Sequence, residues 1–261
     1  MEPIAALPVA SATPDGAVRE AYRVTLAQRP DQLRAAQALR FAVFNLELQE
    51  GLAQSYATGL DADAFDAACD HLIVEHVASG SVVGTYRLQT GTHAAQAHGY
   101  YSAREFDFTP FEPLRERVVE LGRACIHAEH RSFAVLNLLW IGIADYARTH
   151  GARWLIGCSS MTTQDPAVGA AAWRQLALHL AAPALRTRPM PAFVCPLDTV
   201  APTPPKIPRL LAAYLALGAE ICGPPAIDRE FRTIDFLTLV DLESSAIRSL
   251  QSRGRFAGLS R

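Results

Sequence analysis

The segment Glu120-Leu121-Gly122-Arg123 places a carboxylate and a guanidinium three positions apart on a predicted strand. On a regular strand these side chains point to opposite faces, so both reach one cleft only if the strand bulges, and Gly122 would tolerate a bulge. Such a pair is more often structural than catalytic. If Glu120 faces a partly desolvated cleft, its pKa rises and it can accept a proton from an ammonium nucleophile, directly or through water. His127, on the following turn, is the competing proton acceptor, although a lone histidine at a strand end is usually just a hydrogen-bonded polar residue.

A second group of candidates is an acidic loop with Asp61, Asp63, Asp66 and Asp70, followed by His71. These residue types suggest a metal, but their spacing misses the calcium-loop pattern and lacks its glycine, so we expect no metal. Two interpretations remain. The loop is either a solvated segment with helix caps, or a carboxylate cluster that pairs with buried arginines and receives a cationic amine substrate.

The junction between His127 and Ala134 joins the predicted Glu120 strand to a helix. Free N–H groups at the start of a helix form a natural phosphate site, and Arg131 adds a fixed charge. A loop that wraps a pyrophosphate needs several glycines so that its backbone can approach closely. None occurs between Arg123 and Trp140, which weakens the case for coenzyme A as a donor.

The elements that position these residues form a mixed α/β or α+β pattern with a largely antiparallel start. A Gly/Ser link over residues 78–81 predicts a hairpin, and Asp31 is expected to cap the first helix. Regular Rossmann alternation and a GxGxxG motif are absent from the sequence. Strands are predicted over residues 22–26, 72–77, 82–88, 117–127, 154–158 and 231–242, and helices over 31–44, 133–149, 166–181, 208–217 and near 243.

The composition fits one globular domain. Half of the 261 residues are hydrophobic and 19% are charged, so we expect a single domain over residues 21–261 after a flexible segment over 1–20. The formal net charge of -2 gives no reason to expect a nucleic acid partner. Five cysteines without a CxxC pair indicate reduced thiols in the cytoplasm, and no spanning helix or secretory signal is predicted. Ser159-Ser160 lacks the GxSxG pattern, so a serine hydrolase has little support.

A series of short blocks follows a recognisable order over about residues 22–242. The blocks are Arg40-Phe41-Ala42-Val43-Phe44, Asp63-Ala64-Phe65-Asp66, Asp70-His71-Leu72, Glu120-Leu121-Gly122-Arg123, Leu138-Leu139-Trp140, Gly157-Cys158-Ser159-Ser160, Asp165-Pro166, Pro204-Pro205 and the segments 83–88, 101–106, 214–219 and 228–235. Together they resemble the bacterial ornithine N-acyltransferases, the hemolysin-like GNAT proteins that make lyso-ornithine lipid. The first half is also similar to acyl-homoserine-lactone synthases.

The resemblance implies a GNAT acyl-CoA N-acyltransferase-like fold, in which helices flank a mixed central sheet. It implies acyl carrier protein as the partner and acyl donor, with acyl-CoA less expected and no permanently bound cofactor. Phosphopantetheine on a carrier protein offers a single phosphate, which fits the junction without glycines. Arg131 and the N–H groups of Ser132, Phe133 and Ala134 would hold that phosphate.

The resemblance also implies a charged active site. Glu120 would accept the proton, and Asp63 and Asp66 would hold the acceptor amine or the arginines that frame it. A backbone N–H of the Glu120 strand would face the thioester oxygen, because acyl transfer needs a donor where the oxyanion develops. The implied catalytic residues are Glu120, Arg123, Asp63 and Asp66, and the implied substrate-binding residues are Arg40, Phe44, Arg87 and His127.

The acceptor is left open by departures from the family pattern, such as Ala124 in place of the usual serine. We expect a long, sometimes 3-hydroxylated, acyl chain to be transferred by direct aminolysis to the α-amine of ornithine or a related amino acid. The alternatives are a signal synthase of the acyl-homoserine-lactone type and a non-catalytic module that binds acyl carrier protein or lipid. A lipid product is compatible with loose contact with the inner membrane. The arginines that would meet an acidic carrier protein, or else lie on a solvated surface, are Arg131, Arg148, Arg153, Arg186 and Arg188.

Overall fold

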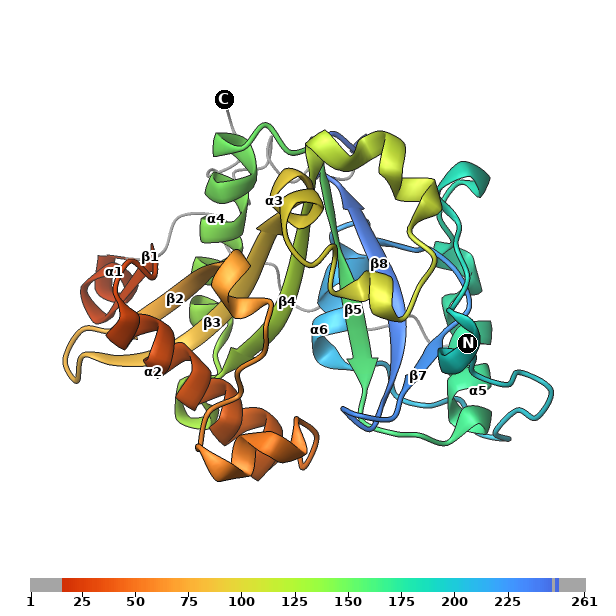
Figure 1. The fold of residues 1–261 in the computed structure, drawn as a ribbon, viewed down its shortest axis with the longest axis horizontal. Coiled ribbons are helices and arrows are strands. Elements are labelled where there is room, and N and C mark those ends of the chain that lie inside the picture. The colour runs from red at the N-terminus through yellow and green to blue at the C-terminus, as the bar shows by residue number, and fades with distance from the viewer. Residues whose placement is uncertain (1–15, 246, 249–261) are drawn as a thin grey trace.

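The computed structural model describes residues 16–245 and 247–248, which form a central sheet with helices on both faces (Figure 1). The strand order is β1-β2-β3-β4-β5-β8-β6, with β7 also paired to β8. Neighbours are antiparallel except β4 and β5, which run parallel. The expected mixed α/β architecture is therefore confirmed. The strands are β1 Tyr22–Leu26, β2 Asp70–His76, β3 Ser81–Thr90, β4 Val118–Ile126, β5 Trp154–Met161, β6 Glu220–Ile221, β7 Ala226–Asp228 and β8 Thr233–Asp241.

Helices α2 and α4 cover opposite faces of the first half of the sheet (Figure 1). The apolar stripe of α4 packs Leu139 and Ile143 against Tyr86 and Leu88 of β3, whereas Arg40 of α2 reaches the opposite face. Ser132 caps α4, so this helix begins and ends as the sequence predicts. The helices are α1 Gly16–Ala21, α2 Pro30–Arg40, α3 Gly91–Gln96, α4 Phe133–Thr149, α5 Pro166–Leu176 and α6 Arg209–Ala216.

The structure corrects several predicted boundaries. Asp31 is not the cap of α2, because Pro30 takes the first helical position and Asp31 instead accepts hydrogen bonds from the Arg29 guanidinium. The α2 helix continues as a π-helical turn, Phe41–Glu47, beyond the predicted end. Strand β8 begins two residues late because Arg232 has a φ of 58°.

Three other differences concern short or terminal segments. Strands β6 and β7 were not predicted, since two or three residues carry no periodic signal. Residues 16–20 of the expected flexible lead-in belong to α1, and residues 1–15 lie outside the described part. The last predicted helix, near Glu243, also lies largely outside the described residues. Within the described chain, no helix combines the length and apolar character needed to cross a membrane.

Two local features of β4 open the centre of the sheet. The pairing of β4 with β5 extends only from Val118 to Glu120, after which the strands separate. On its other edge, Gly122 pairs with Arg87 and Cys125 pairs with Thr85, so two residues of β4 oppose one of β3. The extra residue is accommodated by Arg123, which has a φ of 49°. The bulge that the sequence required is present, one position after Gly122.

Candidate active site

A cavity of about 320 Å³ lies where β4 and β5 separate. One wall is the stretch of β4 from Glu120 to Ala124, and the opposite wall is the stretch of β5 from Cys158 to Ser160. Gly157 marks the point of closest approach, because a Cβ there would lie 2.2 Å from the Leu121 carbonyl oxygen. Beyond this point β4 has no partner on its β5 side, so backbone polar groups of the bulge are left for a ligand in the cavity.

Glu120 lies in the cavity wall and is 4% exposed. Its two carboxylate oxygens accept hydrogen bonds from the backbone N–H groups of Tyr101 at 2.8 Å and Ser102 at 2.7 Å. Burial raises the pKa of Glu120, and the bonds from Ser102 and Tyr101 and the charge of Arg87 offset only part of this rise. A buried carboxylate of raised pKa is suited to accept a proton at a pH near neutrality.

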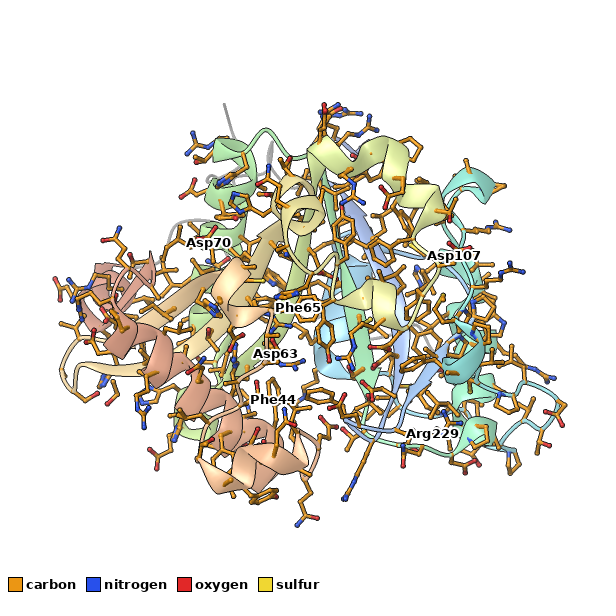
Figure 2. All side chains as sticks on the ribbon, viewed as in Figure 1. Phe44, Asp63, Phe65, Asp70, Asp107 and Arg229 are labelled. Carbon is orange, nitrogen blue, oxygen red and sulfur yellow. The ribbon has the colours of Figure 1, made fainter. Side chains whose placement is uncertain are left out.

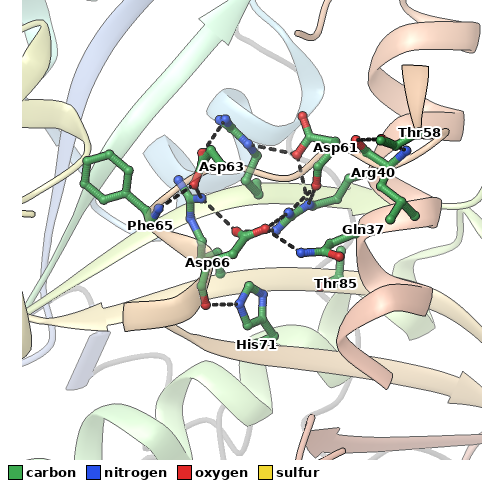
Figure 3. Close-up of polar contacts among 12 residues, drawn as sticks. Gln37, Arg40, Thr58, Asp61, Asp63, Phe65, Asp66, His71 and Thr85 are labelled. Carbon is green, nitrogen blue, oxygen red and sulfur yellow. Dashed lines mark hydrogen bonds and ion pairs between the residues drawn. The ribbon is translucent and has the colours of Figure 1, made fainter. Parts of the chain in front are cut away.

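Behind the cavity, arginines and aspartates form a closed ring of alternating charge, which we call the charge ring (Figure 3). Each aspartate contacts two arginines and each arginine contacts two aspartates, at distances such as 2.6 Å between Arg87 Nη1 and Asp63 Oδ1. The ring joins α2, the acidic loop, β3 and β4. In order around the ring, its members are Arg40, Asp61, Arg123, Asp63, Arg87 and Asp66.

In the charge ring, the Asp63 and Asp66 carboxylates are paired with arginines. Burial would raise the pKa of each carboxyl, but the neighbouring arginines outweigh it and hold both pKa values below the ordinary range. Gln37 adds a hydrogen bond of 2.9 Å to Asp66. These carboxylates are fully occupied, and neither lines the cavity. Of the two roles that the resemblance left open, the structure therefore favours holding the arginines over holding the amine.

Two arginines of the ring also reach the cavity. Arg87 lines it, and its Nη2 is a buried donor without a partner among the described residues. Arg123 lies between two aromatic rings, 4.2 Å from the centroid of Phe231 and 4.8 Å from that of Tyr101. Such stacking holds the guanidinium plane in place. Phe44, seen with Asp63 over the centre of the sheet in Figure 2, lines the cavity as expected for a substrate contact.

His127 does not line the cavity. It stands after the end of β4, where its Nδ1 accepts a hydrogen bond from the Glu129 N–H and its ring packs near His130. The sequence placed it on the correct turn after β4, and none of residues 127–130 lines the cavity. Its predicted role in binding substrate stays a prediction.

The start of α4 offers fewer free groups than expected. Arg131 is paired with Glu47 at 2.6 Å, and the Ser132 N–H donates to the His130 carbonyl. The N–H groups of Phe133 and Ala134 remain, because the first turn of a helix leaves them without intrahelical partners.

The proposed carrier-facing arginines do not form one patch. Arg131 precedes α4 and Arg148 lies in its last turn, so the 17-residue helix separates them by roughly 25 Å. Arg153 is paired with Asp241 at 2.7 Å. Arg131 directly precedes the start of α4, and the guanidinium of Arg186 is bound to the Ala181 carbonyl.

Sequence reasoning missed a second group of titratable residues, Glu105, Asp228 and Asp235, which we call the acidic pocket. All three are buried and line the cavity. They come from segments about 130 residues apart, so no local spacing reveals them, although both segments belong to the blocks that carry the resemblance. Burial and the charges of Asp235 and Asp228 raise the pKa of Glu105, and burial and the charge of Asp228 raise that of Asp235.

Two described groups have ligand spacing for a metal. One comprises Glu105, Cys158 and Asp235, whose ligand atoms lie within 4.8 Å of one another. Burial keeps the pKa of the Cys158 thiol well above its ordinary value, which disfavours the thiolate that a metal needs. The other group is His127, Glu129 and His130, of which Glu129 is exposed and the two histidines are half-buried. Neither geometry requires a metal.

Comparison with known proteins identifies the class. Residues 39–141 match the family model described as an acetyltransferase (GNAT) domain. The solved structure of FeeM, an N-acyl amino acid synthase from uncultured soil microbes, superposes with a TM-score of 0.54 at 11% identity, covering 89% of this chain and 96% of that one. MesI, a CoA-dependent acyl-homoserine lactone synthase, gives 0.52 at 14% identity, covering 89% and 95%. These comparisons assign the GNAT fold to the chain.

Curated relatives narrow this class. An L-ornithine N(alpha)-acyltransferase of Rhodobacter capsulatus is 33% identical over 236 residues, which cover 85% of this chain and 91% of the relative. The enzyme of the same name from Brucella abortus is 34% identical over 252 residues, covering 88% of each. The chain belongs to this family of amino acid N-acyltransferases.

Proposed function

We propose that the protein transfers a long fatty acyl chain, including 3-hydroxylated chains, from acyl carrier protein to the α-amine of ornithine or a related amino acid. The observation that carries the proposal is Glu120, a buried carboxylate of raised pKa in the wall of the cavity between β4 and β5. The names of the curated relatives support ornithine as the acceptor.

The cavity supplies a partner for each polar group of an amino acid backbone. The unpaired Nη2 of Arg87 suits the α-carboxylate, because a guanidinium donates charge-assisted hydrogen bonds to carboxylates. Glu120, which contacts the same cavity, suits the α-ammonium. Arg123 would act from the bulge, where its stacked guanidinium keeps the backbone of β4 in its strained conformation.

The reaction is a direct aminolysis. Glu120 accepts a proton from the α-ammonium, and the amine nitrogen attacks the thioester carbonyl carbon. A backbone N–H of the open stretch Gly122 to Ala124 donates to the developing oxyanion. The carbon–sulfur bond then breaks, and the thiolate takes the second proton from nitrogen, which leaves the N-acyl amino acid and the free thiol.

Acyl carrier protein is favoured as the donor by the start of α4. Two free N–H groups, of Phe133 and Ala134, match one phosphate of phosphopantetheine. Arg131 would join them by exchanging Glu47 for the phosphate. We place the enzyme in the cytoplasm, where the donor is made, with loose contact with the inner membrane that would receive a lipid product.

The test is to incubate the protein with acyl carrier protein thioesters or acyl-CoA and a panel of amino acids, and to detect products by mass spectrometry. N-acyl ornithine from the carrier-protein donor is expected. A Glu120→Gln variant should lower kcat by about 10²- to 10⁴-fold while remaining folded. No N-acyl amino acid from any pair of substrates would refute the proposal. A lactone from S-adenosylmethionine would instead indicate a signal synthase, and donor binding without turnover a binding module.

A further inference from the structure

The acidic pocket is not explained by acyl transfer to an α-amine. Glu105 follows a short turn after Ser102, Asp228 ends β7, and Asp235 lies in β8 beside Ser160 of β5. Glu105 and Asp235 are 2% and 3% exposed, and their carboxylate oxygens lie within 4.8 Å of each other. Two carboxylates so close and so buried repel each other unless a proton or a cation lies between them.

The described residues provide no cation for this pocket. The charge of Arg104 acts on Glu105, but the Arg104 guanidinium is bound to Glu230 at 3.2 Å on the surface. Asp228 Oδ1 accepts hydrogen bonds from the backbone N–H groups of Glu230 and Phe231, which carry no charge. The negative charge of Asp228 therefore acts on Asp235 and raises its pKa. Without a cation, Glu105 and Asp235 share a proton near neutral pH, because the pKa of Glu105 is raised to about 10, and the pocket keeps a net negative charge that a bound cation would balance.

Several buried side-chain polar atoms that line the same cavity have few or no hydrogen-bond partners among the described residues. Oε2 of Glu105 and Oδ1 of Asp235 have no hydrogen bond to a described donor other than the proton that the two carboxyls can share and the nearby Ser160 hydroxyl. Both side-chain polar atoms of Gln89, which is 2% exposed and pairs across the sheet with Glu120, have no partner among the described residues. Buried polar atoms are almost always hydrogen-bonded, so such a concentration in one cavity indicates a polar ligand.

We propose that Glu105 and Asp235, with Asp228 behind them, bind the side-chain ammonium of a diamino acid acceptor and so determine its selection. The proposal rests on the proposed function, since it concerns the other end of the same acceptor. An ammonium group has three donors and one positive charge, which match the free oxygens and the excess charge.

The two ends of the cavity are connected through Ser102 and Cys158. The Ser102 hydroxyl lies beside Glu120 and beside the Cys158 thiol, and that thiol lies within 4.8 Å of the Glu105 and Asp235 carboxylates. An amino acid whose α-amine faces Glu120 therefore directs its side chain along Ser102 toward the acidic pocket. Arg87 and the acidic pocket give the cavity a positive and a negative end, as a zwitterion with an added ammonium requires.

The test compares ornithine with norleucine, which has a methyl group in place of the side-chain ammonium. The wild-type protein should prefer ornithine in kcat/KM by about 10²- to 10⁴-fold, because a site built for hydrogen bonding rejects an analogue that leaves it unpaired. Glu105→Gln and Asp235→Asn should each lower kcat/KM for ornithine by about 10- to 100-fold and leave that for norleucine nearly unchanged. Asp145→Asn, which removes an exposed carboxylate paired with Arg148, is the matched control and should change neither value.

Binding of ornithine to the wild-type protein, measured by calorimetry without donor, keeps the proposal testable if a variant does not fold. Micromolar or millimolar binding of ornithine with none of norleucine is expected. The assignment would be overturned if the variants lowered kcat/KM equally for ornithine and norleucine, or if the wild-type protein bound both amino acids equally. So would a stoichiometric metal in the purified protein whose removal abolishes ornithine binding. If the wild-type protein acylates no amino acid at all, the proposed function fails, whereas selectivity unaffected by the variants defeats only this inference.

Discussion

The charge ring and the acidic pocket both bury several ionised side chains, but they balance charge differently. In the ring, three arginines alternate with three aspartates and every carboxylate contacts two guanidinium groups. In the pocket, three carboxylates share no buried cation of the described chain. Burial removes water from the charged groups in both regions at a cost in free energy, and only in the ring do ion pairs between its own residues offset this cost. The paired charges of the ring stabilise the fold, whereas the unpaired carboxylates of the pocket are suited to bind a cationic ligand.

The pKa values of carboxyl groups are shifted in opposite directions in the charge ring and in the acidic pocket. Burial opposes ionisation in both regions, yet arginines hold the pKa values of Asp63 and Asp66 below the ordinary range. Burial and neighbouring carboxylates raise those of Glu105 and Asp235. The ring therefore stabilises the fold above the ordinary pKa of an aspartate, and this stabilisation is lost as pH falls through the lowered values. The pocket has the opposite sign, since its carboxyl groups favour the fold when protonated and this contribution is lost as pH rises through the raised values.

Breaking the ring should give the largest effect on stability. Asp66→Asn leaves Arg40 and Arg87 each without one of two partners in a buried site, and we expect a loss of about 3–5 kcal/mol in the free energy of unfolding. Urea denaturation monitored by circular dichroism measures it. Asp31→Asn is the control, since its pair with Arg29 is exposed, and it should cause no measurable change. A ring variant as stable as the control would contradict the structural role of the ring.

Neutralising a carboxyl of the acidic pocket should raise the free energy of unfolding, by less than breaking the charge ring lowers it. Glu105→Gln removes a carboxyl that the fold keeps protonated well above its ordinary pKa, so the free energy of unfolding should rise by about 1–3 kcal/mol at a pH above neutrality while activity toward ornithine falls. The gain over wild type should shrink as pH falls and the wild-type pair takes up protons. Denaturant titrations across this pH range measure the trend. A variant that is destabilised equally at every pH would show that the pocket is compensated in the ligand-free protein.

The sequence predicts the parts of this site that lie close together in the chain. Glu120 and Arg123 share one strand, and the requirement that both face one cleft predicts the bulge found at Arg123. The acidic loop predicts pairing with arginines, which the ring bears out. The roles assigned to these residues in catalysis and binding remain proposals.

What the sequence could not predict depends on tertiary structure. The closure of the ring joins residues from four elements, and the acidic pocket joins Glu105 to β7 and β8 across more than a hundred residues. That His127 lies outside the cavity lining could not be predicted, because the direction of a turn is not encoded by the spacing of its residues. Asp61 was noted as part of the loop, but its burial against Arg40 and Arg123 follows only from the packing of α2 over the sheet.

The most direct test of the contrast is the effect of ornithine on the unfolding free energy of the wild-type protein and of Glu105→Gln. A ligand that binds only the folded state at about 100 times its Kd adds about 2.7 kcal/mol. The account predicts this gain for the wild-type protein with ornithine and little gain for either protein with norleucine. For Glu105→Gln with ornithine at the same concentration, a 10- to 100-fold weaker Kd reduces the gain to about 0.4–1.4 kcal/mol. Equal stabilisation of the wild-type protein and the variant by ornithine would contradict the claim that the acidic pocket awaits a cationic side chain.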